Sequence, residues 1–205
     1  MEKTSHNENT EAHIIETAKR LFLKNGYKNT NMCDIALETG INRTKLHYYF
    51  NTKEKMFKAV FSEIIESFLP EIQDILHKNE DFFLKIDKII EQYIKLLLKN
   101  PYLPLFIIGE INRDIKHLLD AAYSVGLQEY LDEIKQTLTE EMKKGNIKTL
   151  PLHIIFMSFI SQLIFPFLAK NIVNEILVCE DVQSQDIIQE WKSYLSIHVR
   201  TILTP

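Results

Sequence analysis

The sequence predicts an all-α protein: a small N-terminal head of three helices with a helix-turn-helix, followed by a larger helical domain. Glycine and proline are scarce, with 5 and 6 copies in 205 residues, fewer than proteins rich in hairpins or glycine loops use. Apolar residues recur every three or four positions over long stretches that single Gly or Pro residues separate. Hydrophobic residues make up 45% and charged residues 25%, so the chain is expected to bury an ordinary globular core.

The first expected helix spans residues 11–24 and follows residues 1–9, which are polar and expected to form a flexible tail. That stretch lacks the apolar segment of a signal peptide, so secretion is not indicated. The apolar side chains of the helix share one face, and the charged ones fall on the other. Asn25-Gly26 is expected to end the helix. The inward-facing residues are Ile14, Ile15, Ala18, Leu21 and Phe22.

A short second helix is expected to begin near Thr30 or Asn31 and to bury Ile35 and Ala36. It ends at Gly40, because glycine readily adopts the left-handed turn that redirects the chain. A helix, a tight turn at a glycine and a second helix, in this order, are typical of a helix-turn-helix.

The third helix is expected over residues 43–50, with Asn42 as its N-cap. Leu46 and Phe50, one turn apart, are predicted to point into the core, which leaves the opposite face free for a major groove. On that face Arg43 suits a guanine, Thr44 a thymine methyl and Lys45 a phosphate. The candidate DNA-binding residues are Asn31, Asn42, Arg43, Thr44, Lys45, His47, Tyr48, Tyr49 and Lys53.

Two of the head's candidate residues have alternative interpretations. Tyr49 could pack in the core with its hydroxyl bonded locally, and His47 could be an ordinary solvated side chain. Cys33 is assigned no DNA contact. Lys53 is expected to bring its charge to the positive N-terminus of a fourth helix, against the DNA backbone.

This pattern resembles the N-terminal signature of the TetR family over residues 11–57. The resemblance implies a cytoplasmic transcriptional regulator, commonly a repressor, that binds a palindromic double-stranded operator as a homodimer. The chain departs from the family at Thr44, Lys45 and His47-Tyr48, which lie on the DNA-facing surface and alter the expected operator. The matching residues are Gly26-Tyr27, Thr30, Ile35-Ala36, Gly40-Ile41, Leu46, Tyr49-Phe50, Lys53-Glu54 and Met56-Phe57.

The expected domains are the DNA-binding head, residues 10–57, and a ligand-binding and dimerisation domain, residues 58–205. Formal charge differs between them: residues 1–57 carry a net +2 and residues 58–205 a net −6, as a DNA-contacting head on an acidic body would. A fourth helix, residues 52–76, is expected to join them without a linker. Further helices are expected at residues 81–99, 102–109, 111–123, 127–143, 152–170 and 184–202.

By resemblance, the second domain holds a small-molecule effector among its central helices and dimerises through its last two long helices. Ligand binding would tilt the fourth helix and change the separation of the two recognition helices, although ligand-assisted DNA binding remains an alternative. The candidate pocket residues are Tyr93, Leu97, Tyr102, Phe106, His117, Tyr123, Phe156, Phe159 and Gln162. The candidate dimer residues are Phe165, Trp191, Leu195 and Val199.

Other protein classes find little support in the sequence. HExxH, GxGxxG, GxxxxGK[ST] and GxSxG motifs and repeated ExxH motifs are absent, so no catalytic residue, metal site or cofactor is expected. Cys33 and Cys179 have no metal-site spacing. The apolar stretch 152–169 is short and contains polar residues, so a buried or interface helix is expected and not a membrane span. Two alternatives to the ligand sensor remain: a DNA-binding scaffold whose body docks a partner protein, and an all-α enzyme.

Overall fold

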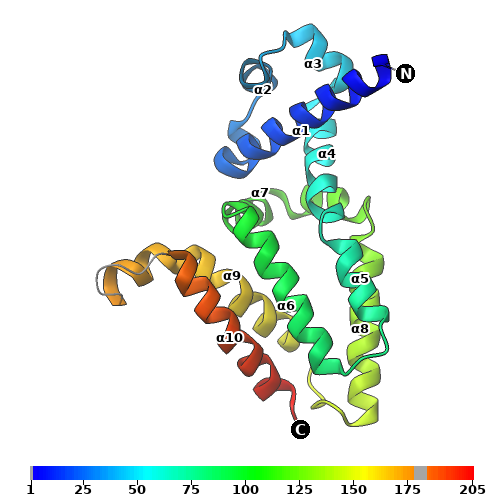
Figure 1. The fold of residues 1–205 in the computed structure, drawn as a ribbon, viewed down its shortest axis with the longest axis vertical. Helices are drawn as coiled ribbons and strands as arrows, with labels where there is room; N and C mark the ends of the chain where they lie inside the picture. Colours follow the sequence, from blue (N-terminus) through cyan, green and yellow to red (C-terminus); the bar gives the residue numbers. More distant parts are fainter. Residues whose placement is uncertain (1, 178–183) are drawn as a thin grey trace. The chain divides into compact units, whose positions relative to one another are not determined.

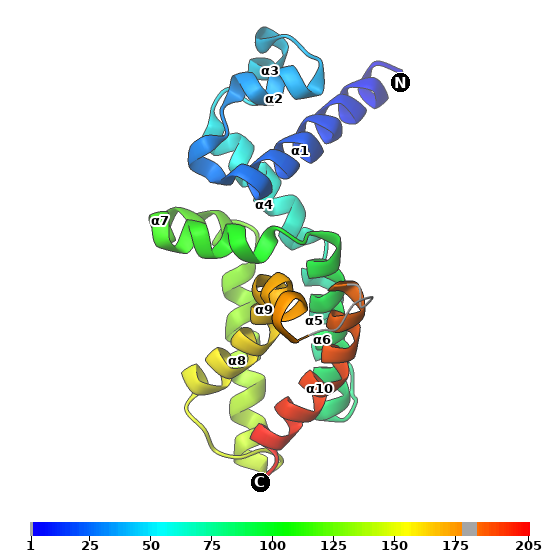
Figure 2. The ribbon, with the colours of Figure 1, turned by 90° about the vertical axis from the view of Figure 1, so that its left-hand side faces the viewer.

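The computed structural model describes residues 2–177 and 184–205, and the described residues form helices with no strand. The predicted all-α class is confirmed (Figures 1 and 2). Cys179 lies outside the described residues, and Cys33 is a free, exposed thiol. The helices are α1 Glu2–Asn29, α2 Met32–Thr39, α3 Arg43–Tyr49, α4 Lys53–Glu66, α5 Leu69–His77, α6 Phe82–Lys99, α7 Leu103–Tyr123, α8 Leu127–Lys144, α9 Leu152–Leu177 and α10 Ser184–Leu203.

Contacts divide the chain into two compact units. Unit 1 contains the residues up to Ser67 together with 105–127, and unit 2 contains 68–104 and 128–205. Most of α7 therefore packs with the N-terminal helices, whereas the sequence placed this stretch in the second domain. The chain passes between the units after Ser67, Pro104 and Leu127.

The core of unit 1 forms where α1 packs against α2 and α4 and α2 packs against α3. Ile14, Phe22, Ile35 and Leu46 are fully buried there. Helix α1 has a break at Gly26, whose φ of 78° is left-handed, as the sequence predicts, and one further turn follows it. Residues 2–9 were expected as a tail but are helical; they contain neither Gly nor Pro, so nothing in them stops the helix.

One continuous helix was expected over residues 52–76, and that prediction is wrong. The chain forms α4 and α5 with a break at Ser67 and Phe68. Pro70 is the physical reason, since its ring lacks an N–H and clashes with the carbonyl four residues earlier, at Glu66, where α4 ends.

Helix α7 was expected as two helices separated near Gly109, but the break lies at Asp114. Asp114 has non-helical backbone angles, φ −165° and ψ 87°. Its carboxylate accepts a hydrogen bond from the backbone N–H of His117 at 3.1 Å, as the N-cap of a new helical segment does. Gly109 stays helical because no left-handed turn occurs there.

Unit 2 is a bundle in which α6 packs against α5, α9 and α10, and α10 also packs along α9 (Figure 1). Its core includes Ile90, Ile94, Leu163, Ile188 and Leu195. The expected helices 81–99, 127–143 and 184–202 correspond to α6, α8 and α10 within one or two residues. Helix α9 is longer than expected and runs on to Leu177.

Pro166 lies inside α9 without ending it. Because proline has no N–H, the carbonyl of Gln162 loses the hydrogen bond that residue 166 would otherwise donate. Trp191 on α10 supplies the missing donor: its Nε1–H bonds the Gln162 carbonyl at 2.9 Å. The Trp191 indole therefore replaces, across the α9–α10 contact, the hydrogen bond that Pro166 cannot donate.

This compensation makes Trp191→Phe destabilising by about 1–3 kcal/mol, because a half-buried carbonyl loses its partner. The penalty is expected to shrink in a Pro166→Ala background, where residue 166 regains an N–H. Urea unfolding followed by circular dichroism of the four proteins of this double-mutant cycle measures the difference. The smaller ring of phenylalanine affects both backgrounds alike, so equal penalties in the two would contradict the explanation.

Candidate nucleic-acid interface

Side-chain caps fix both helices of the helix-turn-helix. Asn31 accepts from the backbone N–H of Asp34 at 2.9 Å, and the Asp34 carboxylate accepts in return from the Asn31 N–H. Gly40 ends α2 in the left-handed conformation, with φ 67°. Asn42 then accepts from the N–H of Lys45 at 2.8 Å and begins α3. The amide oxygens of both asparagines are thus engaged in caps.

The two faces of α3 differ as the sequence predicts. Leu46 is fully buried and Phe50 is 6% exposed, so these side chains anchor the helix to the core. The other face is open: Tyr48 is 76% exposed, and Arg43, Thr44 and Lys45 are exposed as well. A helix held by one apolar face with cations and hydroxyls on the other has the form that enters a major groove.

The remaining candidates on α3 are only partly accessible. His47 and Tyr49 are half-buried, and the Arg43 Nε–H points to His47 Nε2 at 3.4 Å. The rings of Tyr48 and Tyr49 meet edge to face at 5.3 Å. Arg43 therefore leans along the helix toward His47, and the DNA-binding roles of these residues stay predictions.

Lys53 begins α4, but its ammonium is engaged within the protein. Nζ lies 4.3 Å from the centre of the Tyr27 ring and donates to the carbonyl of Lys28 at 3.4 Å. Partial burial lowers the pKa of Lys53, and the nearby Arg113 charge acts in the same direction. To reach a phosphate, Lys53 must leave this position or share it.

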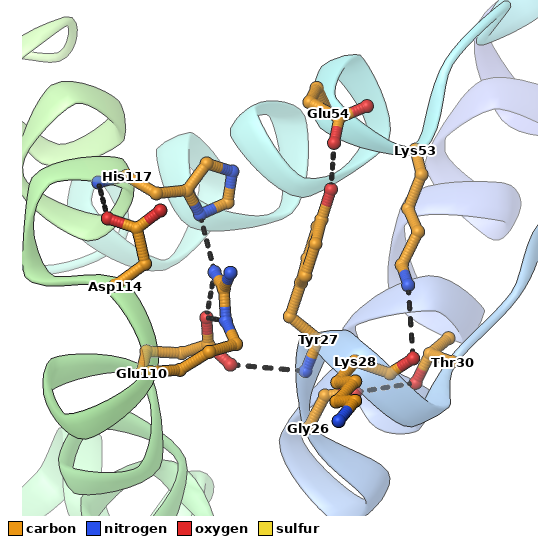
Figure 3. A network of polar contacts seen from close by, with 10 residues as sticks. Gly26, Tyr27, Lys28, Thr30, Lys53, Glu54, Glu110, Asp114 and His117 are labelled. Carbon is orange, nitrogen blue, oxygen red and sulfur yellow. Dashed lines mark hydrogen bonds and ion pairs between the residues drawn. The ribbon is translucent and has the colours of Figure 1, made fainter.

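Tyr27 is the centre of a cluster that joins α1, α4 and α7 inside unit 1. Its hydroxyl donates to Glu54, and its backbone N–H donates to Glu110 at 3.2 Å. Figure 3 shows the ring between Lys53 on one side and His117 on the other, and the ring centres of Tyr27 and His117 are 4.8 Å apart. Burial and the bond to Glu54 raise the pKa of Tyr27, so its hydroxyl stays protonated.

The α7 side of this cluster is an ion pair in which the carboxylate is buried and the guanidinium is partly exposed. Glu110 is 3% exposed, and its Oε2 accepts from Nε and Nη2 of Arg113 at 2.8 and 2.5 Å. The same Nη2 lies 2.8 Å from Nδ1 of His117. The other nitrogen of His117, Nε2, is buried without a hydrogen-bond partner among the described residues.

The sequence did not single out Tyr27, Glu110 or Arg113 as a cluster. Tyr27 appeared only as a motif residue, and Glu110 lies 83 positions along the chain from it. The one local signal was an acid and a base three residues apart on a helix, a pattern that also occurs on solvated surfaces.

Unit 2 holds a cavity of about 400 Å³ between α5, α6, α8, α9 and α10, and its lining is almost entirely apolar. Of the candidate pocket residues, Tyr93, Phe156, Phe159 and Gln162 line it. The sequence did not predict any of the lining from α8, where Tyr130, Leu131, Ile134 and Leu138 recur at helical spacing. The other candidates lie outside the cavity: Leu97, Tyr102, Phe106, His117 and Tyr123.

Two capped helices meet at a glycine turn, and the second helix is anchored on one face and presents cations and hydroxyls on the other. This arrangement defines a helix-turn-helix DNA-binding protein. Residues 14–60 match the family model "Bacterial regulatory proteins, tetR family". Residues 14–60 therefore carry the helix-turn-helix head of TetR-family transcriptional regulators.

Two characterised relatives illustrate the similarity. The chain is 28% identical over 142 residues to the biofilm operon icaADBC negative transcriptional regulator IcaR of Staphylococcus epidermidis, over 64% of this chain and 66% of that protein. It is 24% identical over 135 residues to a fatty acid metabolism regulator protein of Bacillus subtilis, over 66% of this chain and 69% of that one. The chain thus spans about two thirds of the length of these relatives, which are regulators and not enzymes.

The fold is also that of solved structures. The fatty acid degradation regulator FadR from Bacillus halodurans superposes with a TM-score of 0.68 at 19% identity, over 91% of this chain and 94% of that one. At this level of identity the likeness shows the fold.

Proposed function

We propose that this chain is a cytoplasmic transcriptional repressor that binds a palindromic operator as a homodimer and leaves it when a small molecule occupies unit 2. The observation that carries the proposal is the exposed face of α3, with Leu46 and Phe50 buried behind it. Its relatives are negative or metabolic regulators by name, which favours repression.

Operator binding by Arg43→Ala tests the DNA-reading role. The variant is expected to lose about 1–3 kcal/mol of binding free energy and to relax the preference at one base position, because a bidentate arginine–guanine pair is lost. Fluorescence anisotropy on the DNA flanking the gene, across a salt series, measures both.

Lys116→Ala is the matched control for that experiment, since it removes an exposed cation from α7 away from α3. The control is expected to bind like the wild type. Equal affinity of Arg43→Ala and the wild type on every operator variant would refute the assignment.

The homodimer is proposed to form through an apolar stripe on α9. Large apolar side chains are exposed at intervals of three or four residues along the helix, except between Met157 and Phe165, where the exposed residue is Ser161. Tyr194 and Ile197 of α10 are exposed too. A patch of this kind marks an interaction surface, and a two-fold partner would pair two heads on a palindrome. The stripe consists of Ile154, Met157, Phe165, Leu168, Ile172 and Ile176.

The candidate dimer residues fall in different places. Phe165 is 65% exposed and lies on the stripe. Leu195 and Val199 are buried in their own protomer and cannot reach a partner directly, which corrects that expectation. Their face of α10 packs against α6 and α9. Trp191 is half-buried and donates to Gln162.

The segment Leu152–Val173 of α9 is long and apolar enough to cross a membrane, with a mean hydropathy of 1.9. The stripe offers another use for this apolar character, because one face of the helix packs on α6 and α10 and the other meets a second copy.

Release of the operator is proposed to follow from the chain connections between the units. Helix α4 leads directly into α5, whose Leu76 lines the cavity, and the chain enters unit 1 again two residues into α7. A ligand that shifts these elements would move α4 and thereby α3. The proposal fails if a ligand that saturates the cavity leaves operator affinity unchanged.

A further inference from the structure

The residues that line the cavity of unit 2 extend over about three turns of two different helices. Its lining on α6 runs from Phe82 to Tyr93, and its lining on α9 runs from Leu152 to Gln162. At 1.5 Å per residue these stretches are about 16 and about 15 Å long. Two independent helices thus give the same length, and a volume of about 400 Å³ spread over that length leaves room for a thin molecule.

One end of the cavity is closed by a pair of neutral hydroxyls. The hydroxyls of Tyr93 and Tyr130 lie 3.0 Å apart and bond each other. Burial raises the pKa of both, so neither carries charge. Gln162, at this end, donates to the Ser158 carbonyl and faces His198. No charged side chain lines this end among the described residues, so a buried ionic head would have no counter-ion there.

The lining residues that reach solvent lie elsewhere. Phe156 is 56% exposed, and His153 and Lys135 are exposed as well. Lys135 is paired with Asp132 at 2.7 Å, but an ion pair this exposed is weak and leaves the ammonium free to turn. Among the described residues of the lining, the cationic Lys135 and the imidazole of His153 are therefore both exposed to solvent.

We propose that the effector carries one unbranched aliphatic chain, of which the cavity buries about a dozen methylene groups, and an anionic head that stays outside beside Lys135 and His153. This deepens the proposed function and rests on it. Long-chain fatty acids and their thioesters share this chemistry.

A series of saturated fatty acids of increasing length tests whether the effector carries an aliphatic chain. Binding to the delipidated full-length protein is measured by calorimetry, with the primary alcohols of the same lengths in parallel. Affinity is expected to rise about fourfold per added methylene and to level off at about a dozen. Each acid is expected to bind about threefold more tightly than its alcohol, the size of an exposed charge contact.

Two variants and their controls locate the ligand. Ile134→Phe places a ring in the middle of the cavity and is expected to move the plateau to shorter chains, whereas Gln136→Phe, on the exposed side of α8, leaves it in place. Lys135→Gln is expected to abolish the preference for acids over alcohols, and Lys143→Gln, also exposed on α8, to retain it. Operator binding without ligand confirms that each variant is folded.

Binding that ignores chain length, or a plateau that Ile134→Phe does not move, would overturn the proposal. Equal binding of acids and alcohols would overturn the placement of the head. Thioesters assayed beside the free acids show whether the effector is a free fatty acid or a fatty acid thioester. If fatty acids bind as expected but do not change operator affinity, the proposed release mechanism fails and the proposed ligand class stands. If the protein binds its operator but binds no fatty acid, only the proposed ligand class fails.

Discussion

Arg113→Leu is expected to lower the free energy of unfolding by about 3–5 kcal/mol, because it leaves the buried Glu110 carboxylate without its counter-ion. Glu110 is 3% exposed and keeps only the hydrogen bond from the Tyr27 backbone N–H, at 3.2 Å. Both hydrogen bonds from the guanidinium are lost with the charge. Urea unfolding followed by the circular dichroism of the helices measures the change.

The double variant Arg113→Leu/Glu110→Leu is the control that separates charge from packing. Replacing both partners of a buried pair with apolar residues is often neutral or stabilising, so most of the lost stability is expected to return. Arg113→Lys keeps the charge but loses the two-pronged geometry, and an intermediate loss is expected. A double variant no more stable than Arg113→Leu would show that the burial of the Glu110 charge is not the cause.

The head was predictable from sequence because its signals are local. The caps Asn31 and Asn42 and the turn at Gly40 each act within four residues, so the two helices and their connection follow from neighbouring residues. The inward direction of Leu46 and Phe50 follows from helical periodicity alone. Pro70 was an equally local signal, and it predicts the α4–α5 break by the same reasoning.

The rest of the site could not be read from neighbouring residues. Tyr27 meets Glu110 only because α7 packs with the N-terminal helices, a contact between residues 83 positions apart. The aromatic residues that the sequence offered as pocket walls divide between the units, and periodicity does not say which apolar face borders a cavity. Likewise, Leu195 and Phe165 are both apolar residues on long helices; only packing shows that one is 0% and the other 65% exposed.

Phe165→Glu is expected to convert the protein to a monomer and to weaken operator binding. Phe165 lies near the middle of the α9 stripe, and two-fold symmetry would bring two such substitutions into one interface. A central aromatic is worth about 2 kcal/mol or more at an interface, so two are worth about 4 kcal/mol, or about three orders of magnitude in the dimer dissociation constant. Sedimentation velocity and operator binding measure the two effects.

Leu84→Glu is the matched control, because it places the same charge at an exposed apolar residue of α6, 43% exposed and away from the stripe. This control is expected to remain dimeric and to bind the operator like the wild type. A wild-type protein that sediments as a monomer at operator-saturating concentrations would contradict the two-fold assignment, and the stripe would then have to serve another partner. A dimeric Phe165→Glu protein would instead move the interface off α9, because a stripe carrying two central carboxylates could not hold two copies together.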